Sequence, residues 1–196
     1  MPSRWRGRLG FHTRGCNGFT LIELMLTVSI VGILATVAIP TMMRFQLKAK
    51  AAESRVNIAA IREAEEIYFA ESGVYVSAVP VLPLSIGPVR VAWLLADTDV
   101  HGFNEIGWAP EGELYFQYGV KTNGELAYTI EARSDIDGDG AYNTWGYVKP
   151  IPGTSAGVAG PLALCPVTGV FDPGTGAPNR LNLIGPCDPG SRASKY

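Results

Sequence analysis

The sequence predicts an α+β protein in which a long N-terminal helix packs on a small antiparallel β-sheet, followed by a C-terminal loop region with two cysteines. Three observations support this fold class. An uncharged stretch, residues 24–43, passes directly into a segment without Gly or Pro, residues 44–72. Alternating polar and apolar residues with an Asn-Gly turn follow within residues 113–149. Cys165 and Cys187 lie in a Gly- and Pro-rich tail.

Size and charge leave room for one globular domain with an appendage. The chain has 196 residues with 16 basic and 18 acidic side chains, so its net charge is −2. These values exclude a multidomain enzyme and a nucleic-acid binder that relies on bulk positive charge. The charge is unevenly placed, because residues 1–18 hold four arginines and no acidic residue. Without these four, 12 basic residues remain against 18 acidic ones, a net charge of −6.

The uncharged stretch is long enough to cross a bilayer. About 20 apolar residues span a hydrocarbon core some 30 Å thick, and residues 24–43 reach this length. The arginines precede the stretch and the acidic bulk follows it, so the positive-inside rule places the C-terminal domain across the membrane. No Ala-x-Ala-like cleavage site follows Met43, and the polarity changes instead at Gly18–Phe19. A plain single-pass anchor is the alternative on hydropathy alone.

We expect the helix to continue beyond the membrane. Residues 44–72 are rich in Ala, Glu, Arg and Ile, and Gly73 supplies a C-terminal cap. Residues 19–72 therefore predict one helix of roughly 80 Å, apolar at 19–43 and amphipathic at 44–73, where it lies on the domain. Spacings of three and four predict one apolar face in the second half: Phe45, Ala49, Ala52, Val56, Ala59, Ala60, Ile67 and Ala70. The remaining surface carries charge: Glu53, Arg55, Arg62, Glu65 and Glu66.

The rest of the chain predicts a small meander between two loop regions. Residues 74–112 are punctuated by Pro and Gly and predict a connecting loop with one apolar turn at 91–95. Within the predicted sheet, residues 113–149, alternation favours three strands: 113–120, 125–133 and 144–149. Asn123–Gly124 predicts a hairpin turn between the first two. Residues 150–196 are rich in Gly and Pro and predict loop.

The strongest functional signal is a six-residue motif that opens the apolar run. Gly18–Glu23 reads GFTLIE and stands between a basic leader, residues 1–18, and the membrane helix. This arrangement resembles the type IV pilin family, and the helix, sheet and cysteine pair extend the resemblance over nearly the whole chain. The resemblance implies that a prepilin peptidase cuts between Gly18 and Phe19 and that Phe19 is then N-methylated. A glycine there lets a protease approach the backbone closely.

The same resemblance assigns roles to three positions inside the apolar segment. Glu23 is the only charged residue between the cut and Arg44, and a carboxylate there is costly unless paired. Like the family's glutamate, it is expected to meet the new amine of a neighbouring subunit during assembly. The alternative is an acid that merely favours the helix N-terminus. Gly32 and Pro40 bracket a stretch implied to unwind on assembly, since Pro40 cannot donate a backbone hydrogen bond; a continuous kinked helix is the alternative.

The cysteine count suits a domain outside the cytoplasm. Cys16 lies in the leader, so leader removal leaves Cys165 and Cys187 as one pair, which favours a disulfide in an oxidising compartment. Such a bond would stabilise the domain by roughly 3 kcal/mol. In the resemblance, the pair brackets the variable loop that faces the filament surface. Two free buried thiols are the alternative.

An acidic run suggests calcium as a cofactor, and no other cofactor is predicted. Asp135, Asp137 and Asp139 take the first, third and fifth places of a calcium loop, and Asn143 could add an oxygen. The twelfth place is Gly146 instead of a bidentate Glu, which excludes an EF-hand. An Asx-rich turn between strands is the alternative to weak calcium binding.

The hypothesis for the function is a structural subunit. The resemblance implies a pilin that forms a homopolymer, the type IV pilus, with prepilin peptidase/methyltransferase and the inner-membrane assembly machinery as partners. The precursor is expected among inner-membrane lipids with its N-terminus inside, and the filament on the cell surface. No nucleophile–base pair is found, so no enzyme activity is predicted, and nucleic acid is expected only as DNA-uptake cargo. The alternatives are a pseudopilin of type II secretion and a membrane-tethered calcium-binding domain that does not polymerise.

Overall fold

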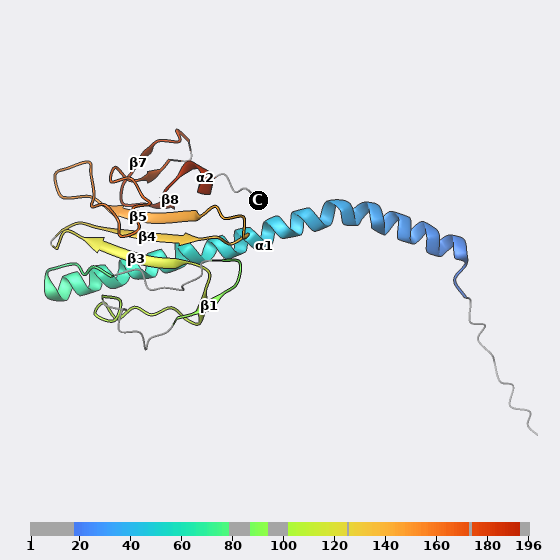
Figure 1. Cartoon of the computed structure of the whole chain (residues 1–196), viewed down its shortest axis with the longest axis horizontal. Helices are drawn as coiled ribbons and strands as arrows, with labels where there is room; N and C mark the ends of the chain where they lie inside the picture. Colours follow the sequence, from blue (N-terminus) through green and yellow to red (C-terminus); the bar gives the residue numbers. More distant parts are fainter. Residues whose placement is uncertain (1–17, 79–86, 94–101, 125, 173, 193–196) are drawn as a thin grey trace, which may run out of the picture. The chain divides into compact units, whose positions relative to one another are not determined.

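The computed structural model describes residues 18–78, 87–93, 102–124, 126–172 and 174–192. The chain divides into two compact units, Met1–Thr41 and Met42–Tyr196, and helix α1 (Leu21–Ser72) contributes to both (Figure 1). Most of the predicted leader, with Cys16, and the end of the predicted turn at 91–95 lie outside the described residues.

The described part of the first unit is the apolar half of α1. Its residues from Gly18 to Thr41 are exposed apart from the half-buried Ala35. By length and composition this segment can cross a membrane, with a mean hydropathy of 2.3 over an 18-residue window. Its hydroxyl side chains donate to carbonyls one turn earlier, as Ser29 does to Met25 at 2.8 Å and Thr36 to Ile33 at 2.6 Å. Intrahelical bonding of this kind satisfies polar groups where lipid offers no partner.

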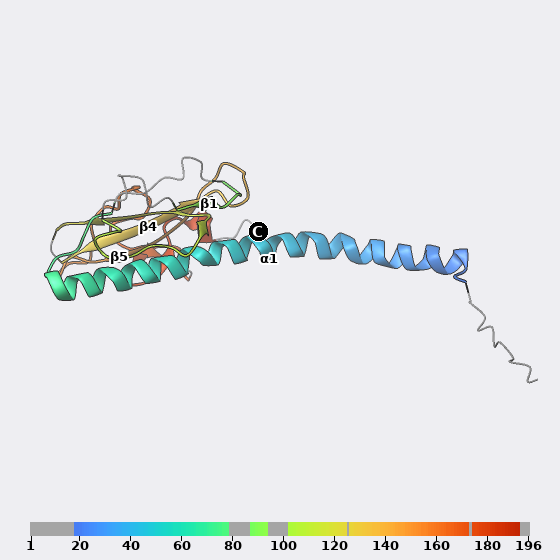
Figure 2. The ribbon, with the colours of Figure 1, turned by 90° about the horizontal axis from the view of Figure 1, so that it is seen from below.

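The second unit has three layers. Its central sheet, within the described residues, has the antiparallel strand order β3 (Gln117–Thr122), β4 (Tyr128–Ser134), β5 (Asn143–Lys149) and β8 (Ile184–Pro186). The second half of α1 covers one face of this sheet (Figure 2). The segment 156–165 covers the other face, where the Thr129 hydroxyl donates to the Val158 carbonyl at 2.6 Å.

The hydrophobic core lies between α1 and the sheet. Alternate residues of the strands face the helix because successive strand side chains point to opposite faces. The largest fully buried side chains of this core are Tyr118, Tyr128, Phe103, Phe116, Ile58, Ile61, Ile130 and Ile136. Burying such side chains contributes roughly 1.5–3 kcal/mol each, so this layer supplies most of the driving force for folding the domain.

The face of α1 that packs on the sheet is not the predicted apolar face. The buried residues of the helix are Ser54, Ile58, Ile61 and Glu65. At about 100° per residue, these residues lie opposite the predicted face, on which Phe45, Val56 and Ile67 are 62%, 68% and 57% exposed. Both faces carry apolar side chains, and spacing alone does not say which one a sheet will cover. The predicted face, which is exposed apart from the half-buried Ala59 and Ala60, is called the exposed stripe below.

The first predicted strand, residues 113–120, is wrong as a single element. The structure has a short β2 (Glu113–Leu114), a break, and then β3. In the break, the N–H groups of Tyr115 and Phe116 donate to the Glu53 carboxylate of α1 at 3.0 and 3.3 Å. β2 pairs instead with β1 (Val91–Ala92), which lies in the predicted loop 74–112. At residues 115 and 116 the Glu53 carboxylate therefore takes the place of a neighbouring strand as hydrogen-bond acceptor, and the β1–β2 pairing ends there.

The predicted hairpin at Asn123–Gly124 is confirmed. Gly124 has φ +89°, which an L side chain rarely adopts, and the Asn123 N–H donates to the Ala127 carbonyl at 3.2 Å. Thr122 pairs with Tyr128, so the connection is longer than a two-residue turn. β4 and β5 match the other two predicted strands to within a few residues, and Gly73 caps α1 as predicted, with φ +77°.

The described part of residues 150–196 is mostly loop, as predicted, but it also contains short elements that the prediction missed. β6 (Val170–Phe171) pairs with β7 (Pro178–Arg180), β8 extends the central sheet, and α2 covers Pro189–Arg192. β8 has the sequence Ile-Gly-Pro, which has poor intrinsic strand preference. It forms because the edge of β5 offers unpaired backbone groups, which a local pattern in the tail does not reveal.

Glu65 is fully buried although the sequence pattern places it on the charged surface. Its Oε2 accepts the Val76 N–H at 3.1 Å, and its Oε1 has no hydrogen-bond partner among the described residues. Burial outweighs that hydrogen bond and raises the pKa of Glu65 to about 7, with a smaller contribution from the neighbouring Glu66 charge. A carboxyl group with this pKa is largely protonated in mildly acidic solution.

We expect the domain to lose stability as pH rises from about 4.5 to about 7. In this pH range Glu65 keeps its proton in the folded protein. In the unfolded chain the pKa of Glu65 is near 4.5, so the same carboxyl group has released its proton. The free energy of unfolding should fall by at most about 3 kcal/mol over this pH range. Glu65→Gln should flatten the dependence and raise stability at pH 8, measured by urea unfolding of the detergent-solubilised chain at pH 5 and pH 8. The exposed Glu63→Gln is the control, and an unchanged slope in Glu65→Gln would contradict the assignment.

Candidate functional site

The predicted cleavage position lies just ahead of the helix. Residues 18–20 are not helical, and α1 begins at Leu21. Among the described residues, no atom outside the chain neighbours of Gly18 lies within 4 Å of the place that a Cβ there would take, and Phe19 is 83% exposed. The peptide bond between them is therefore accessible and lies outside the hydrogen-bonded helix, as a protease substrate must. A cut here would leave Phe19 as the new N-terminus, two residues before α1.

Glu23 and Thr20 form a capping box at the start of α1. The Thr20 N–H and hydroxyl donate to Glu23 Oε2 at 3.2 and 2.9 Å, and the Glu23 N–H donates to Thr20 Oγ1 at 3.2 Å. Such reciprocal bonds satisfy backbone donors that have no partner within the helix. In the single chain Glu23 thus has the helix-end role, and its carboxylate remains exposed at the surface. Pairing with a neighbour's amine stays a prediction.

Gly32 and Pro40 both lie inside helical structure. α1 is continuous through them, with Pro40 in its interior. A continuous helix through Gly32 and Pro40 is what the alternative to unwinding predicts, and it is the state of the single chain. Pro40 still lacks the N–H of a normal helical residue, so the preceding turn has one hydrogen bond fewer. Unwinding on assembly stays a prediction.

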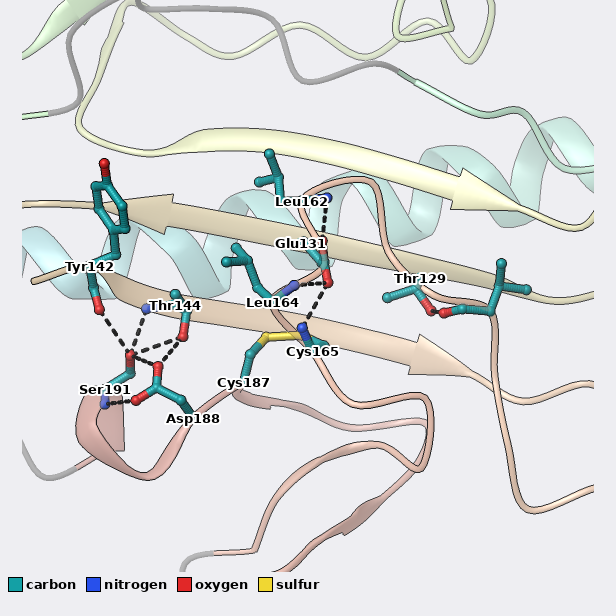
Figure 3. The surroundings of a disulfide bond; sticks show 11 residues. Thr129, Glu131, Tyr142, Thr144, Leu162, Leu164, Cys165, Cys187, Asp188 and Ser191 are labelled. Carbon is teal, nitrogen blue, oxygen red and sulfur yellow. Dashed lines mark hydrogen bonds between the residues drawn. A yellow bond between two sulfur atoms is a disulfide. The ribbon is translucent and has the colours of Figure 1, made fainter.

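The cysteine prediction is confirmed. Cys165 and Cys187 form a disulfide, and both residues are buried (Figure 3). The alternative of two free thiols is therefore wrong. The bond joins the segment that covers the outer face of the sheet to the end of β8.

The acidic loop connects β4 to β5, and the structure brings its aspartates together. Ligand oxygens of Asp135, Asp137 and Asp139 lie within 4.8 Å of one another. Asp135 also accepts the N–H groups of two loop glycines at 2.9 and 3.1 Å, and Asp139 accepts the Ala141 N–H at 2.7 Å. The Asn143 Oδ1 accepts the Trp145 indole N–H at 2.5 Å. The loop therefore combines Asx turns with a close group of carboxylates.

An ion-pair network that the sequence pattern did not indicate joins α1 to the sheet. The Lys149 ammonium contacts Glu66 Oε1 at 2.7 Å, and the hydroxyls of Tyr128 and Tyr75 donate to Glu66 at 2.9 and 3.0 Å. Burial works against the charged form, but these hydrogen bonds outweigh it and lower the pKa of Glu66. Tyr128 lies 62 residues and Lys149 lies 83 residues from Glu66 in the sequence. No local motif could therefore identify them as partners.

Comparison with known proteins agrees with the N-terminal geometry. The prokaryotic N-terminal methylation motif matches residues 13–39. The type IV major pilin protein PilA of Myxococcus xanthus (strain DK1622) is 47% identical over 58 residues, which cover 30% of this chain and 26% of that protein. The match thus spans about a quarter of the relative's length, and no solved structure matches the chain significantly. The chain therefore carries an N-terminal methylation motif at the start of its apolar helix and is similar, through its N-terminal region, to a type IV major pilin.

Proposed function

We propose that the chain is the precursor of a structural subunit of a type IV pilus. In this proposal the leader 1–18 is removed, Phe19 is methylated, and the mature chain polymerises with copies of itself through α1. The observation that carries the proposal is the exposed stripe, which follows the membrane segment in the sequence and is largely exposed from Phe45 to Ala70.

Lipid alone does not account for this surface. A bilayer covers about 20 residues of helix, which suits residues 24–43 but leaves the exposed stripe facing water. A plain membrane anchor needs no apolar residues there, and the domain leaves most of them uncovered, because it packs mainly on the opposite face of α1. Ala60, at the edge of the stripe, is the member that packs against the core. Helices of neighbouring copies would cover both segments at once, so polymerisation explains the whole apolar surface.

Partners and location follow from this proposal. The precursor is inserted in the inner membrane, where prepilin peptidase/methyltransferase and the assembly machinery act on it, and the mature subunit forms a surface filament. Its role is structural. A pseudopilin of type II secretion would share the processing and the helix. Long filaments in a fraction sheared from the cell surface support a pilus, and their absence from wild-type cells would favour the pseudopilin.

Val56→Glu should abolish or strongly reduce these filaments without unfolding the domain. Val56 is 68% exposed, so its replacement leaves the core intact, whereas a charge buried between helices in a filament would lack a partner. The matched control is Val89→Glu, because Val89 is 72% exposed and lies outside α1. The assays are filament yield after shearing and thermal melting of the solubilised chain. Normal filaments from Val56→Glu would contradict the role of the exposed stripe.

Calcium binding at residues 135–140 stays a prediction. If calcium binds the three aspartates, the solubilised chain should melt at a higher temperature in calcium than in chelator, because a ligand that binds only the folded state stabilises it. Asp137→Ala should erase the shift, and it spares Asp135 and Asp139, whose carboxylates hold the turn. Equal melting temperatures in millimolar calcium and in chelator would leave the loop as an Asx turn and would not affect the proposed polymerisation.

A further inference from the structure

A row of glycines crosses the outer face of the central sheet and holds a single side chain. Gly119 of β3 pairs with Glu131 of β4, Glu131 pairs with Gly146 of β5, and Gly146 pairs with Gly185 of β8. Because the three neighbours in this row have no side chain, the Glu131 carboxylate lies in a trough across the strands. The residue is 0% exposed.

The C-terminal segment fills the trough and surrounds the carboxylate. The Leu162 N–H donates to Glu131 Oε2 at 2.7 Å, and the N–H groups of Leu164 and Cys165 donate to Oε1 at 2.9 and 2.7 Å (Figure 3). Gly160 lies so close that a Cβ there would collide with the carboxylate. A buried charge is costly without partners, and bonds from backbone N–H groups to a carboxylate are stronger than neutral ones. Glu131 therefore holds residues 160–165 against the sheet.

The partner cysteine is also held by contacts that do not involve sulfur. The Cys187 N–H donates to the Thr144 carbonyl of β5 at 3.1 Å. Figure 3 shows the bond by which the Thr144 N–H donates to the Ser191 hydroxyl at 2.7 Å. A Cβ on Gly146 would lie 2.8 Å from the Cys187 sulfur, so the disulfide itself lies over the glycine row. The backbone N–H groups of both cysteines thus bind the sheet, that of Cys165 through the Glu131 carboxylate and that of Cys187 through the Thr144 carbonyl.

We propose that Glu131 is a positioning residue for closure of the Cys165–Cys187 disulfide, because it folds residues 160–165 onto the sheet before the thiols are joined. Closure by a small disulfide such as oxidised glutathione proceeds in two exchanges. One cysteine thiolate attacks the glutathione disulfide and releases a glutathione thiolate; the second attacks the mixed disulfide and releases another. Two protein thiols are oxidised and one glutathione disulfide is reduced to two thiols. Glu131 takes no part in electron transfer and raises only the effective concentration of the two thiols.

The first test needs no substitution at the carboxylate. In the full chain, solubilised in detergent and carrying Cys16→Ser so that one pair can close, the disulfide is reduced and amide hydrogen exchange is followed. The amides of Leu162, Leu164 and Cys165 should remain protected after reduction. Exchange at the rate of an unstructured peptide would overturn the proposal, because the segment would then depend on the disulfide for its position.

The second test measures the equilibrium of disulfide closure against oxidised and reduced glutathione. In Glu131→Gln one carboxylate oxygen becomes an N–H₂ group that faces an N–H donor, so the effective concentration of the thiols should fall about tenfold or more. Glu53→Gln is the matched control, because Glu53 also accepts two backbone N–H groups but from residues 115 and 116. It should lower overall stability and leave the closure equilibrium unchanged within about twofold.

A second variant covers the case in which Glu131→Gln does not fold. Gly160→Ala crowds the carboxylate while keeping its charge, and it should shift closure in the same direction. The proposal is overturned if the Cys165–Cys187 disulfide of Glu131→Gln has the same closure equilibrium as in the parent chain. If Glu131→Gln does not fold, the same result in Gly160→Ala overturns it. It is overturned equally if Glu53→Gln shifts the closure equilibrium by as much. Neither result bears on the pilus proposal, because both concern the domain alone.

Discussion

Glu23→Ala should yield a chain that enters the membrane normally but forms no filaments. The substitution removes a carboxylate from an apolar segment, which lowers the cost of insertion. It also removes the acidic partner proposed for the amine that cleavage creates at Phe19. The amount of chain in the inner-membrane fraction and the yield of sheared filaments measure the two effects separately.

The capping box provides a control for this experiment. Thr20→Ala removes the two hydrogen bonds of the Thr20 hydroxyl at the helix start but keeps the Glu23 carboxylate. Loss of a cap costs about 1 kcal/mol, so this variant should fray the first turn slightly and still assemble. If Thr20→Ala is as defective as Glu23→Ala, capping accounts for the role of Glu23. Normal filaments from Glu23→Ala would show that the carboxylate is dispensable.

Gly18→Leu should retain the leader, residues 1–18, on the entire membrane-bound population. Among the described residues only chain neighbours lie near Gly18, so the larger side chain should leave the fold unchanged and act on the approach of the peptidase. Gly18→Ala should have a mild or moderate effect. Mass spectrometry of the N-terminal peptide distinguishes N-methyl-Phe19 in the wild type from an intact leader in Gly18→Leu. Complete cleavage of Gly18→Leu, or an intact leader on assembled wild-type protein, would contradict the proposed processing.

Features that depend on neighbours in the chain were predictable from the sequence. The membrane segment follows from hydropathy over about 20 residues, and the extent of α1 follows from propensity up to the glycine cap at Gly73. The hairpin after β3 follows from Asn123–Gly124. The GFTLIE motif lies within the N-terminal methylation motif that matches residues 13–39, and cleavage at Gly18–Phe19 stays a prediction. The relevant contacts in each case lie within a few residues, so composition and spacing are sufficient.

Features that depend on distant partners were decided by the tertiary structure. The sequence shows apolar residues around much of α1, and only packing assigned one face to the sheet and left most of the exposed stripe uncovered. Glu65 and Glu66 are adjacent in sequence, yet one is buried and the other pairs with Lys149 of β5. Strand β8 and the glycine row at Glu131 arise from register between strands that are far apart in the chain. Register and burial are collective properties of the packed chain, so no local pattern contains them.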